Sequence, residues 1–121
     1  IPTNNDNQDV VTMGTIAARK AAQALDLAWH VAAIQALALA QGAEQRAVRE
    51  GHVHADGSAD LDAAGFAPAS RALVASVRAV SAPLGAEDRP LADEITATAA
   101  HLEREPLGES SPGDAPLAYR A

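Results

Sequence analysis

The chain has 121 residues, of which 48% are hydrophobic and 2% aromatic, and it carries a net charge of −7 at pH 7. This length suits one modest domain and is short for a self-sufficient enzyme. An acidic chain without a concentrated basic surface is not built to bind the phosphates of nucleic acid. Because the sequence contains no cysteine, disulfides, thiolate metal sites and cysteine nucleophiles are excluded.

The composition indicates a chain whose stability depends on packing against other protein. Alanine dominates the hydrophobic residues, and it contributes helix propensity more than buried area. The sequence therefore predicts a shallow core that takes much of its stability from packing against something else. Because the chain begins with Ile1 and its one methionine is Met13, we expect a processed product or a fragment.

Residues 1–9, IPTNNDNQD, are polar and rich in asparagine and aspartate, which favour turns and helix N-caps. An Asn-Gln pair at a helix start can present amides that both donate and accept hydrogen bonds, beside backbone N–H groups that attract negative charge. This arrangement suits a substrate carboxylate or a developing anion. The alternative, favoured on these residues alone, is that Asp9 or Asn7 simply caps the helix.

One long helix is predicted over residues 10–47, because this stretch lacks proline and Gly14 is its one glycine before Gly42. Between residues 21 and 40 its polar interruptions are Gln23, Asp26, His30 and Gln35. A helix that is apolar nearly all round lies inside a large protein or inside a membrane. Asp26 and His30 in mid-stretch, together with the weak insertion tendency of alanine, argue against a membrane. We therefore expect burial in a helical bundle or at a subunit interface.

The middle of the chain is predicted to be a connector followed by a shorter helix. Residues 51–67 are rich in glycine, aspartate and alanine and form the connector, with a short helix around 58–64. The helix over 70–81 carries hydrophobic residues at helical spacing and is stopped by Pro83 and Gly85. Its hydrophobic stripe consists of Leu73, Val74, Val77 and Val80.

A last helix is predicted from the segment EDRPLADEI, residues 87–95, to about Arg104. Pro90 suits the first helical turn, with acidic Asp93 and Glu94 close behind. One face of this helix is formed by Leu91, Ile95, Thr98 and Leu102. Residues 106–121 contain glycines, serines and prolines and are predicted to form a loose tail. The fold class is all-α, with one long helix followed by shorter helices.

Four histidines suggest a metal site, but their spacing does not support one. His52 and His54 lie beside acidic residues in a glycine-flanked loop, outside the usual zinc signatures, and a solvated loop is the preferred interpretation. His30 follows Asp26 by four residues, which permits a local hydrogen bond, and it is interpreted as structural. His101 is expected at the surface. No bound metal is predicted.

No Gly-x-Ser-x-Gly elbow, Walker loop or dinucleotide-binding glycine pattern occurs in the chain. One stretch, residues 7–21 with the sequence NQDVVTMGTIAARKA, resembles the C-terminal active-site motif of the aromatic amino acid ammonia-lyases. That family includes the histidine, phenylalanine and tyrosine ammonia-lyases and the related aminomutases. The Ala/Leu-rich helix after the motif and the segment 87–95 are similar to family stretches as well. The resemblance covers residues 1 to about 102, roughly the last quarter of a full member.

The resemblance implies an enzyme that removes ammonia from an aromatic amino acid to give an arylacrylate. Members use an electrophilic group, 4-methylideneimidazol-5-one, formed by cyclisation of an internal Ala-Ser-Gly, which this chain does not contain. Members are also helical tetramers whose active sites draw residues from several subunits. The resemblance therefore implies that an N-terminal polypeptide or companion subunit supplies the group within a larger helical-bundle oligomer. We expect a cytoplasmic protein.

The resemblance also implies three residues of the substrate and cofactor pocket, which are, in order of weight, Gln8, Asn7 and Asn4. Gln8 stands where histidine-specific members carry glutamate. A neutral amide neither acts as a base nor pairs with an imidazolium, so phenylalanine or tyrosine is the implied substrate. Asn7 and Gln8 resemble the Asn-Gln pair that lines the pocket in the phenylalanine and tyrosine members. Asn4 falls where plant-type phenylalanine enzymes place a glutamate near the substrate amine.

By this resemblance, residues 1–9 form an active-site-facing turn segment, 10–105 a helical C-terminal domain segment and 106–121 the tail. Two alternatives stay open. One is an aminomutase, which moves the amine to the β-carbon and uses the same pocket wall. The other is a non-catalytic helical assembly module.

Overall fold

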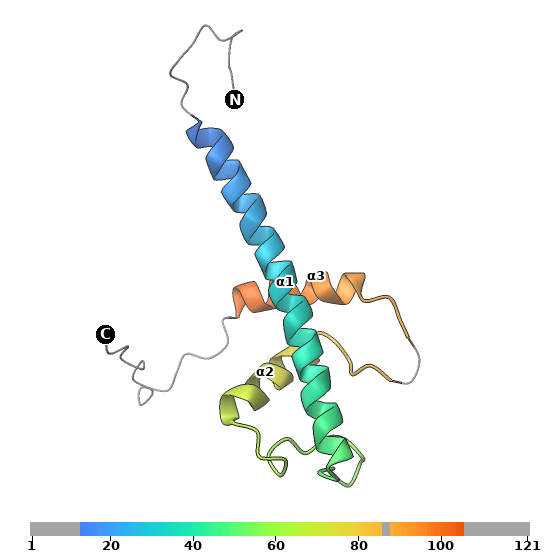
Figure 1. Cartoon of the computed structure of the whole chain (residues 1–121). Coiled ribbons are helices and arrows are strands. Elements are labelled where there is room, and N and C mark those ends of the chain that lie inside the picture. The colour runs from blue at the N-terminus through green and yellow to red at the C-terminus, as the bar shows by residue number, and fades with distance from the viewer. Residues whose placement is uncertain (1–12, 86–87, 106–121) are drawn as a thin grey trace, which may run out of the picture.

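The computed structural model describes residues 13–85 and 88–105, which form three α-helices. Helix α1 spans Gly14–Arg49, α2 spans Pro68–Arg78 and α3 spans Ala92–Arg104. No strand occurs among these described residues, whose β structure is an isolated antiparallel bridge between Val53 and Ala59. The predicted all-α class, with one long helix and shorter ones after it, is therefore confirmed (Figure 1).

Helix α1 is a rod of 36 residues, about 54 Å long at 1.5 Å per residue. It agrees with the helix predicted over 10–47, of which residues 10–12 lie outside the described part of the chain. Alanine-rich composition and the lack of proline allow its uninterrupted length. The helix ends just before Gly51, whose φ of 85° is a left-handed conformation that glycine adopts without strain.

The core lies between the C-terminal half of α1 and the two shorter helices, which both pack against it (Figure 1). The buried residues of α1 are all alanines, namely Ala33, Ala36, Ala40 and Ala47. Small side chains at these positions let the other helices approach closely. Val74 and Val77 of α2 and Leu102 of α3 fill the space opposite. Because alanine buries little area, the core is shallow, as the composition predicts.

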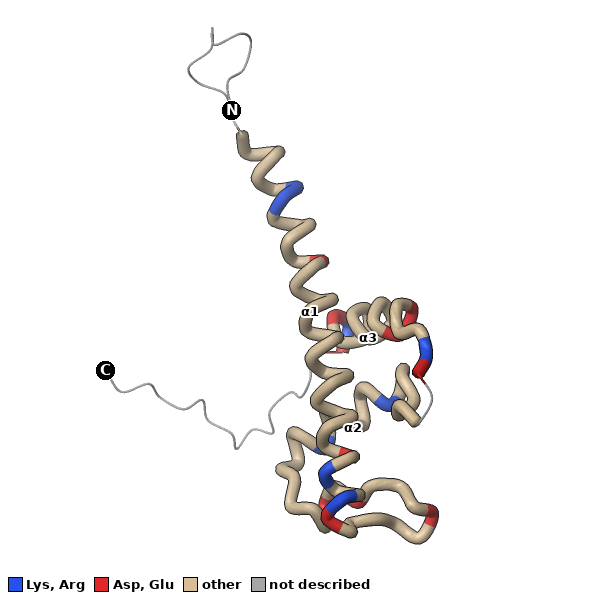
Figure 2. Tube along the Cα trace, turned by 45° about the vertical axis from the view of Figure 1, so that its right-hand side comes forward, with Lys and Arg blue, Asp and Glu red and all other residues tan. Residues whose placement is uncertain are grey.

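The N-terminal half of α1 projects beyond α2 and α3 (Figure 1). We call residues 14–28 the overhang, and every one of them is exposed. Figure 2 shows that charged residues gather around the other end of α1 and on α3, whereas the overhang carries only Arg19, Lys20 and Asp26. By length and hydropathy, α1 is the one helix in the described ranges long and apolar enough to cross a membrane.

The short helix predicted around 58–64 is wrong, because this segment closes only a single turn. The Asp60 carboxylate accepts the N–H groups of Asp62 and Ala63, and the Ala64 N–H donates to the Asp60 carbonyl over 3.1 Å. Gly65 then adopts a φ of 76°, which ends the turn before a helix can propagate.

Helix α2 begins at Pro68, earlier than the predicted 70, and ends at Arg78 rather than near 81. Proline suits the first position of a helix because it lacks the N–H that would find no partner there. Of the predicted hydrophobic stripe, Val74 and Val77 are buried against α1.

Helix α3 starts later than predicted. Pro90 lies before the N-cap residue Leu91, so its placement in the first turn is wrong, whereas Asp93 and Glu94 do occupy that turn. The first helical hydrogen bond runs from the N–H of Ile95 to the carbonyl of Leu91 over 2.8 Å. The predicted inward face is confirmed by its buried members, Thr98 and Leu102.

Candidate functional site

The predicted pocket residues Gln8, Asn7 and Asn4 lie outside the described residues. The nearest described feature is the start of α1, where the N-cap residue Met13 makes no side-chain capping hydrogen bond. The first turn of α1 carries no acidic residue either. Along the chain, the positive end of the α1 dipole therefore comes after the predicted pocket residues, and no carboxylate of the first turn neutralises it.

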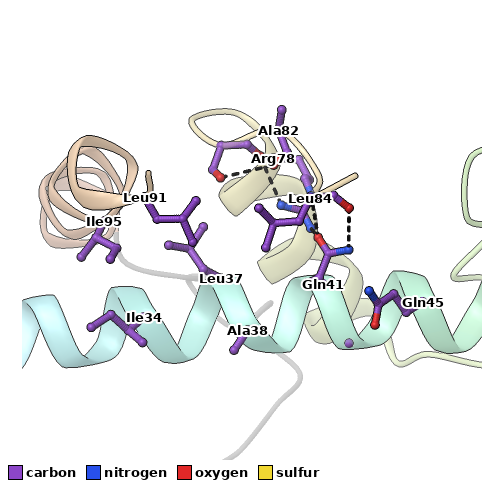
Figure 3. Close-up of a pocket in the computed structure, with 12 residues that line it drawn as sticks. Ile34, Leu37, Ala38, Gln41, Gln45, Arg78, Ala82, Leu84, Leu91 and Ile95 are labelled. Atoms are coloured by element: carbon purple, nitrogen blue, oxygen red, sulfur yellow. Dashed lines mark hydrogen bonds between the residues drawn. The ribbon is translucent and has the colours of Figure 1, made fainter. Parts of the chain in front are cut away.

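A groove of about 310 Å³ lies between α1 and the segment that joins α2 to α3. Its hydrophobic walls come from Ile34, Leu37 and Ala38 of α1, Leu84 of the α2–α3 connector (residues 79–91), and Leu91 and Ile95 around the start of α3. Figure 3 shows Ile34, Leu91 and Ile95 toward one end, and Gln41 and Gln45 toward the other. The groove thus combines a hydrophobic trough with a polar end.

Gln41 fastens the α2–α3 connector to α1 at the polar end of the groove (Figure 3). The Leu84 N–H donates to Gln41 Oε1 over 2.8 Å, and Gln41 Nε2 donates to the Leu84 carbonyl over 3.2 Å. One side-chain amide thus satisfies both backbone groups of one residue, much as a neighbouring strand would. Arg78 Nη2 also donates to Gln41 Oε1 over 3.2 Å.

The charged residue of the groove, Arg78, is already paired. Its Nη2 donates to Glu44 Oε2 over 2.6 Å and its Nε to Glu44 Oε1 over 2.9 Å. Nη1 donates to the carbonyl of Ser81 over 3.3 Å. The two charged side chains are only 16% and 18% exposed, so this bidentate pair ties α2 to α1. Arg78 therefore has a structural role, and its guanidinium is not available to bind an anionic ligand.

A second ion pair fixes the other end of the connector. Arg89 donates to Glu94 through Nε at 2.7 Å and Nη2 at 3.0 Å, and it reaches the Ala82 carbonyl at 2.7 Å. The hydroxyl of Ser81 also donates to Glu94. Hydrogen bonds from Arg89, and then from Ser81, lower the pKa of Glu94 to about 2. A carboxylate held ionised in this way is a structural anchor and not an acid–base group at neutral pH.

The histidines do not form a metal centre in the described part of the chain. His54 Nδ1 lies 3.7 Å from Asp60 Oδ2, but no group of three potential metal ligands is found among the described residues. His30 makes the predicted local contact, since its Nδ1 lies 2.8 Å from the carbonyl of Asp26, although it bonds the backbone and not the carboxylate.

The prediction that His101 lies at the surface is wrong. Its side chain is only 12% exposed, and its Nε2 lies 3.0 Å from the Ser76 hydroxyl of α2. The carboxylate of Glu105 approaches the same Nε2 at 3.9 Å. In a hydrolase the acid would contact the other ring nitrogen, so this trio is a tie between α2 and α3 and not a nucleophilic site. The packing of two short helices hides the imidazole, which the sequence of one helix does not reveal.

Sequence reasoning missed the polar clamp formed by Gln41, Glu44, Arg78, Arg89 and Glu94. One local signal was present, because Arg89 and Glu94 are five residues apart at a helix start. The contacts of Gln41 and Glu44 join positions 43 and 34 residues apart, which periodicity does not identify.

The geometry defines a helical segment with an exposed apolar overhang, a hydrophobic groove and no complete catalytic constellation among its described residues. Comparison with known proteins identifies its class. The family described as aromatic amino acid lyase matches residues 1–83. The chain belongs to this family.

Several curated relatives are similar over most of the chain. A tyrosine ammonia-lyase from Cereibacter sphaeroides is 44% identical over 102 residues, which is 84% of this chain and 17% of the relative. A tyrosine ammonia-lyase from Cupriavidus metallidurans is 39% identical over 109 residues, which is 90% of this chain and 18% of the relative. An MIO-dependent tyrosine 2,3-aminomutase from Streptomyces globisporus is 38% identical over 104 residues, covering 86% of this chain and 16% of the relative.

The chain therefore spans less than a fifth of the length of these relatives, so the share of roughly a quarter expected from the sequence is too large. No solved structure matches it. The overhang and the groove are surfaces of a segment whose relatives are several times longer.

Proposed function

We propose that this chain is the C-terminal portion of an ammonia-lyase that acts on an aromatic amino acid. The reaction breaks the bond between Cα and the amine, removes a proton from Cβ and yields an arylacrylate and ammonia. The observation that carries this proposal is the family match over residues 1–83, together with 44% identity to a tyrosine ammonia-lyase.

Tyrosine is the substrate we put first, and phenylalanine is the alternative. The relatives reported above are named for tyrosine, two as lyases and one as an aminomutase. A glutamine at position 8 agrees with an uncharged aromatic side chain, because a neutral amide gives no ion pair to an imidazolium. The aminomutase is the second candidate function, supported by 38% identity to the Streptomyces globisporus enzyme.

In this proposal Gln8 and Asn7 line one wall of the substrate pocket, and Asn4 is the third pocket residue, with the least weight. Their amides donate and accept hydrogen bonds, so they orient substrate and neighbouring groups without exchanging protons. The start of α1 follows them along the chain. No acidic residue lies in its first turn, so the N–H groups of that turn favour a nearby carboxylate or developing anion.

The electrophilic group comes from elsewhere in this proposal. The chain contains no Ala-Ser-Gly, so it does not form a 4-methylideneimidazol-5-one. In the groove, Gln41 is bound to the backbone of Leu84 and Arg78 to Glu44, so neither side chain is free to hold the group. When bound in the assembled enzyme, that group supplies the electrophile. An N-terminal polypeptide bearing it, assembled with this chain into a cytoplasmic tetramer, completes the proposed enzyme.

The test is co-expression with a Cereibacter sphaeroides polypeptide that lacks the segment aligned with this chain. The proposal expects arylacrylate formation from tyrosine, followed by its ultraviolet absorbance. Gln8→Ala is expected to lower turnover by about tenfold or more, on the scale of a lost polar contact in a site. Gln35→Ala, an exposed amide of α1, is the matched control and leaves turnover unchanged.

Each contrary outcome has a distinct meaning. Unchanged kinetics for Gln8→Ala would remove that residue from the pocket. A β-amino acid as the main product would identify an aminomutase. An assembled complex with neither product would favour the non-catalytic assembly module.

A further inference from the structure

The loop between α1 and α2 contains an Asp-Gly pair, Asp56 and Gly57, at the tip of a short hairpin (residues 53–59). The bridge between Val53 and Ala59 closes this hairpin, and the Gly57 N–H donates to the His54 carbonyl over 3.0 Å. Gly57 has a φ of 84°, a conformation in which any residue with a side chain is strained. The turn therefore requires glycine directly after Asp56.

An Asp-Gly pair is prone to rearrange within its own backbone. The backbone nitrogen of the glycine attacks Cγ of the aspartic acid, and an N–Cγ bond forms. The hydroxyl of the neutral carboxyl group leaves with the proton of that nitrogen as water, which gives a five-membered succinimide ring. Hydrolysis of the ring takes up one water and yields either aspartate or isoaspartate, in which the backbone runs through the former side chain. The reaction needs no cofactor, and it starts from the neutral acid because an ionised carboxylate is a poor electrophile.

Both reacting groups of this pair are engaged in hydrogen bonds within the hairpin. Asp56 Oδ1 accepts the Ser58 N–H over 2.9 Å and the Ser58 hydroxyl over 2.6 Å. These two hydrogen bonds, first that of the hydroxyl and then that of the backbone, lower the pKa of Asp56 below its ordinary value of 3.8. The neutral acid is therefore scarcer at pH 7 than in an unfolded chain. The attack must also break the hydrogen bond of the Gly57 N–H to His54.

We propose that Asp56–Gly57 is a self-modification site of this chain, and that the two hydrogen bonds of Ser58 keep residue 56 an aspartate. Loss of these bonds, by substitution or by local opening of the hairpin, releases the carboxyl group for closure of the succinimide. The contacts that hold the site lie within residues 53–59 and need no other part of the chain.

The modification would act on the contact region between the hairpin and α1. Gly57, Ser58 and Ala59 line a groove of about 370 Å³ together with Val48 and Arg49 at the end of α1. Isoaspartate lengthens the backbone by one carbon directly before these hairpin residues. It would therefore shift the hairpin tip and reshape the groove.

The proposal is tested by incubating the whole chain at pH 7 and measuring isoaspartate by mass spectrometry of the tryptic peptide of residues 50–71. Ser58→Ala is expected to form isoaspartate about tenfold faster than the wild type, on the scale of one lost hydrogen bond to a charged group. Ser58→Thr keeps the hydroxyl and is the matched control, expected to react at the wild-type rate. Asp60, which is followed by Leu61 and lies in the same peptide, stays aspartate in every sample. A rate for Ser58→Ala no higher than that of the wild type would overturn the proposal.

A second measurement separates the effect of the hairpin from that of the sequence. In urea that unfolds the chain, the wild type and Ser58→Ala are expected to form isoaspartate at similar rates, because the hydrogen bonds of Ser58 are lost in both. Both rates are expected to exceed that of the folded wild type. A folded wild-type chain that reacts as fast as the unfolded one would contradict the protective role of Ser58. Neither measurement depends on lyase activity.

Discussion

The alanine-based core makes stability depend on a few larger side chains, and Val77 tests this most clearly. Val77 is 0% exposed and belongs to the core cluster that also contains Ala36, Ala40 and Leu102. Val77→Ala removes two buried carbons, worth about 1.6 kcal/mol at about 0.8 kcal/mol per methylene. The cavity left behind raises the expected loss to about 2–3 kcal/mol. In a domain of this size that corresponds to a fall in melting temperature of roughly 10 °C or more.

The assay is urea denaturation of the whole chain, followed by circular dichroism. Val31→Ala is the matched control, since it makes the same substitution in a helix at a position that is 56% exposed. Its expected effect lies within about 0.5 kcal/mol of wild type. Equal losses for the two variants would refute the conclusion that the contact of α2 and α3 with α1 holds the chain together.

Three further predictions follow from the clamp and from α3. Glu94 has a pKa of about 2 against an ordinary value of 4.5, so its ionisation stabilises the fold above pH 4.5, and this contribution is lost as the pH falls toward 2. Glu94→Gln is therefore expected to lower the urea midpoint at pH 7, with the difference from wild type shrinking over that acidic range. Gln41→Ala is expected to cost about 1–3 kcal/mol and to speed hydrogen exchange of the Leu84 amide, which loses its acceptor. The Thr98 hydroxyl is buried without a hydrogen-bond partner in the described ranges, so Thr98→Val is expected to stabilise the chain by about 1 kcal/mol in urea denaturation.

Two of these predictions have a control variant within the chain. Glu103→Gln changes an exposed glutamate of α3 and is expected to show no comparable acid dependence. Gln45→Ala changes the next amide along the groove and leaves exchange of the Leu84 amide unaffected. A pH-independent gap between Glu94→Gln and wild type would show that the ion pair does not set the acid response. Destabilisation by Thr98→Val would mean that its hydroxyl finds a partner in solution.

The helices were predictable because their signals are local. Absence of proline over residues 10–47 and the spacing of Val74 and Val77 specify helices regardless of the rest of the fold. The predicted helix ends were less accurate than the predicted helices, as the position of Pro90 shows. The start of α3 depends on the contacts that hold the α2–α3 connector in place. The ion pair of Arg89 with Glu94, which fixes this connector, is not predicted by hydrophobic periodicity.

The candidate site was only partly accessible from the sequence, for a similar reason. Gln41 and Leu84 are 43 residues apart, and nothing in the sequence indicates that the side chain of one binds the backbone of the other. His101 is polar in sequence but shielded in the fold, because two short helices meet around it. The pocket residues Gln8 and Asn7 followed from a motif and not from packing, and they remain a prediction.

The exposed overhang gives the family assignment a physical meaning. A rod with exposed Leu25, Leu27 and Val31 leaves hydrophobic area in water that a lone globular domain would cover. The relatives are about six times longer than the aligned segment, and the remainder of such a protein would provide the missing cover.

The proposal that this chain forms part of an ammonia-lyase requires a second polypeptide that bears the electrophilic group. It is tested most directly by native mass spectrometry of the co-expressed material, beside a denaturing spectrum of the same sample. The expected result is a large complex that contains both polypeptides. The second polypeptide should be lighter by two waters than its sequence requires, because cyclisation of Ala-Ser-Gly releases two waters. A 12.4 kDa chain that is found alone or only with copies of itself would contradict it.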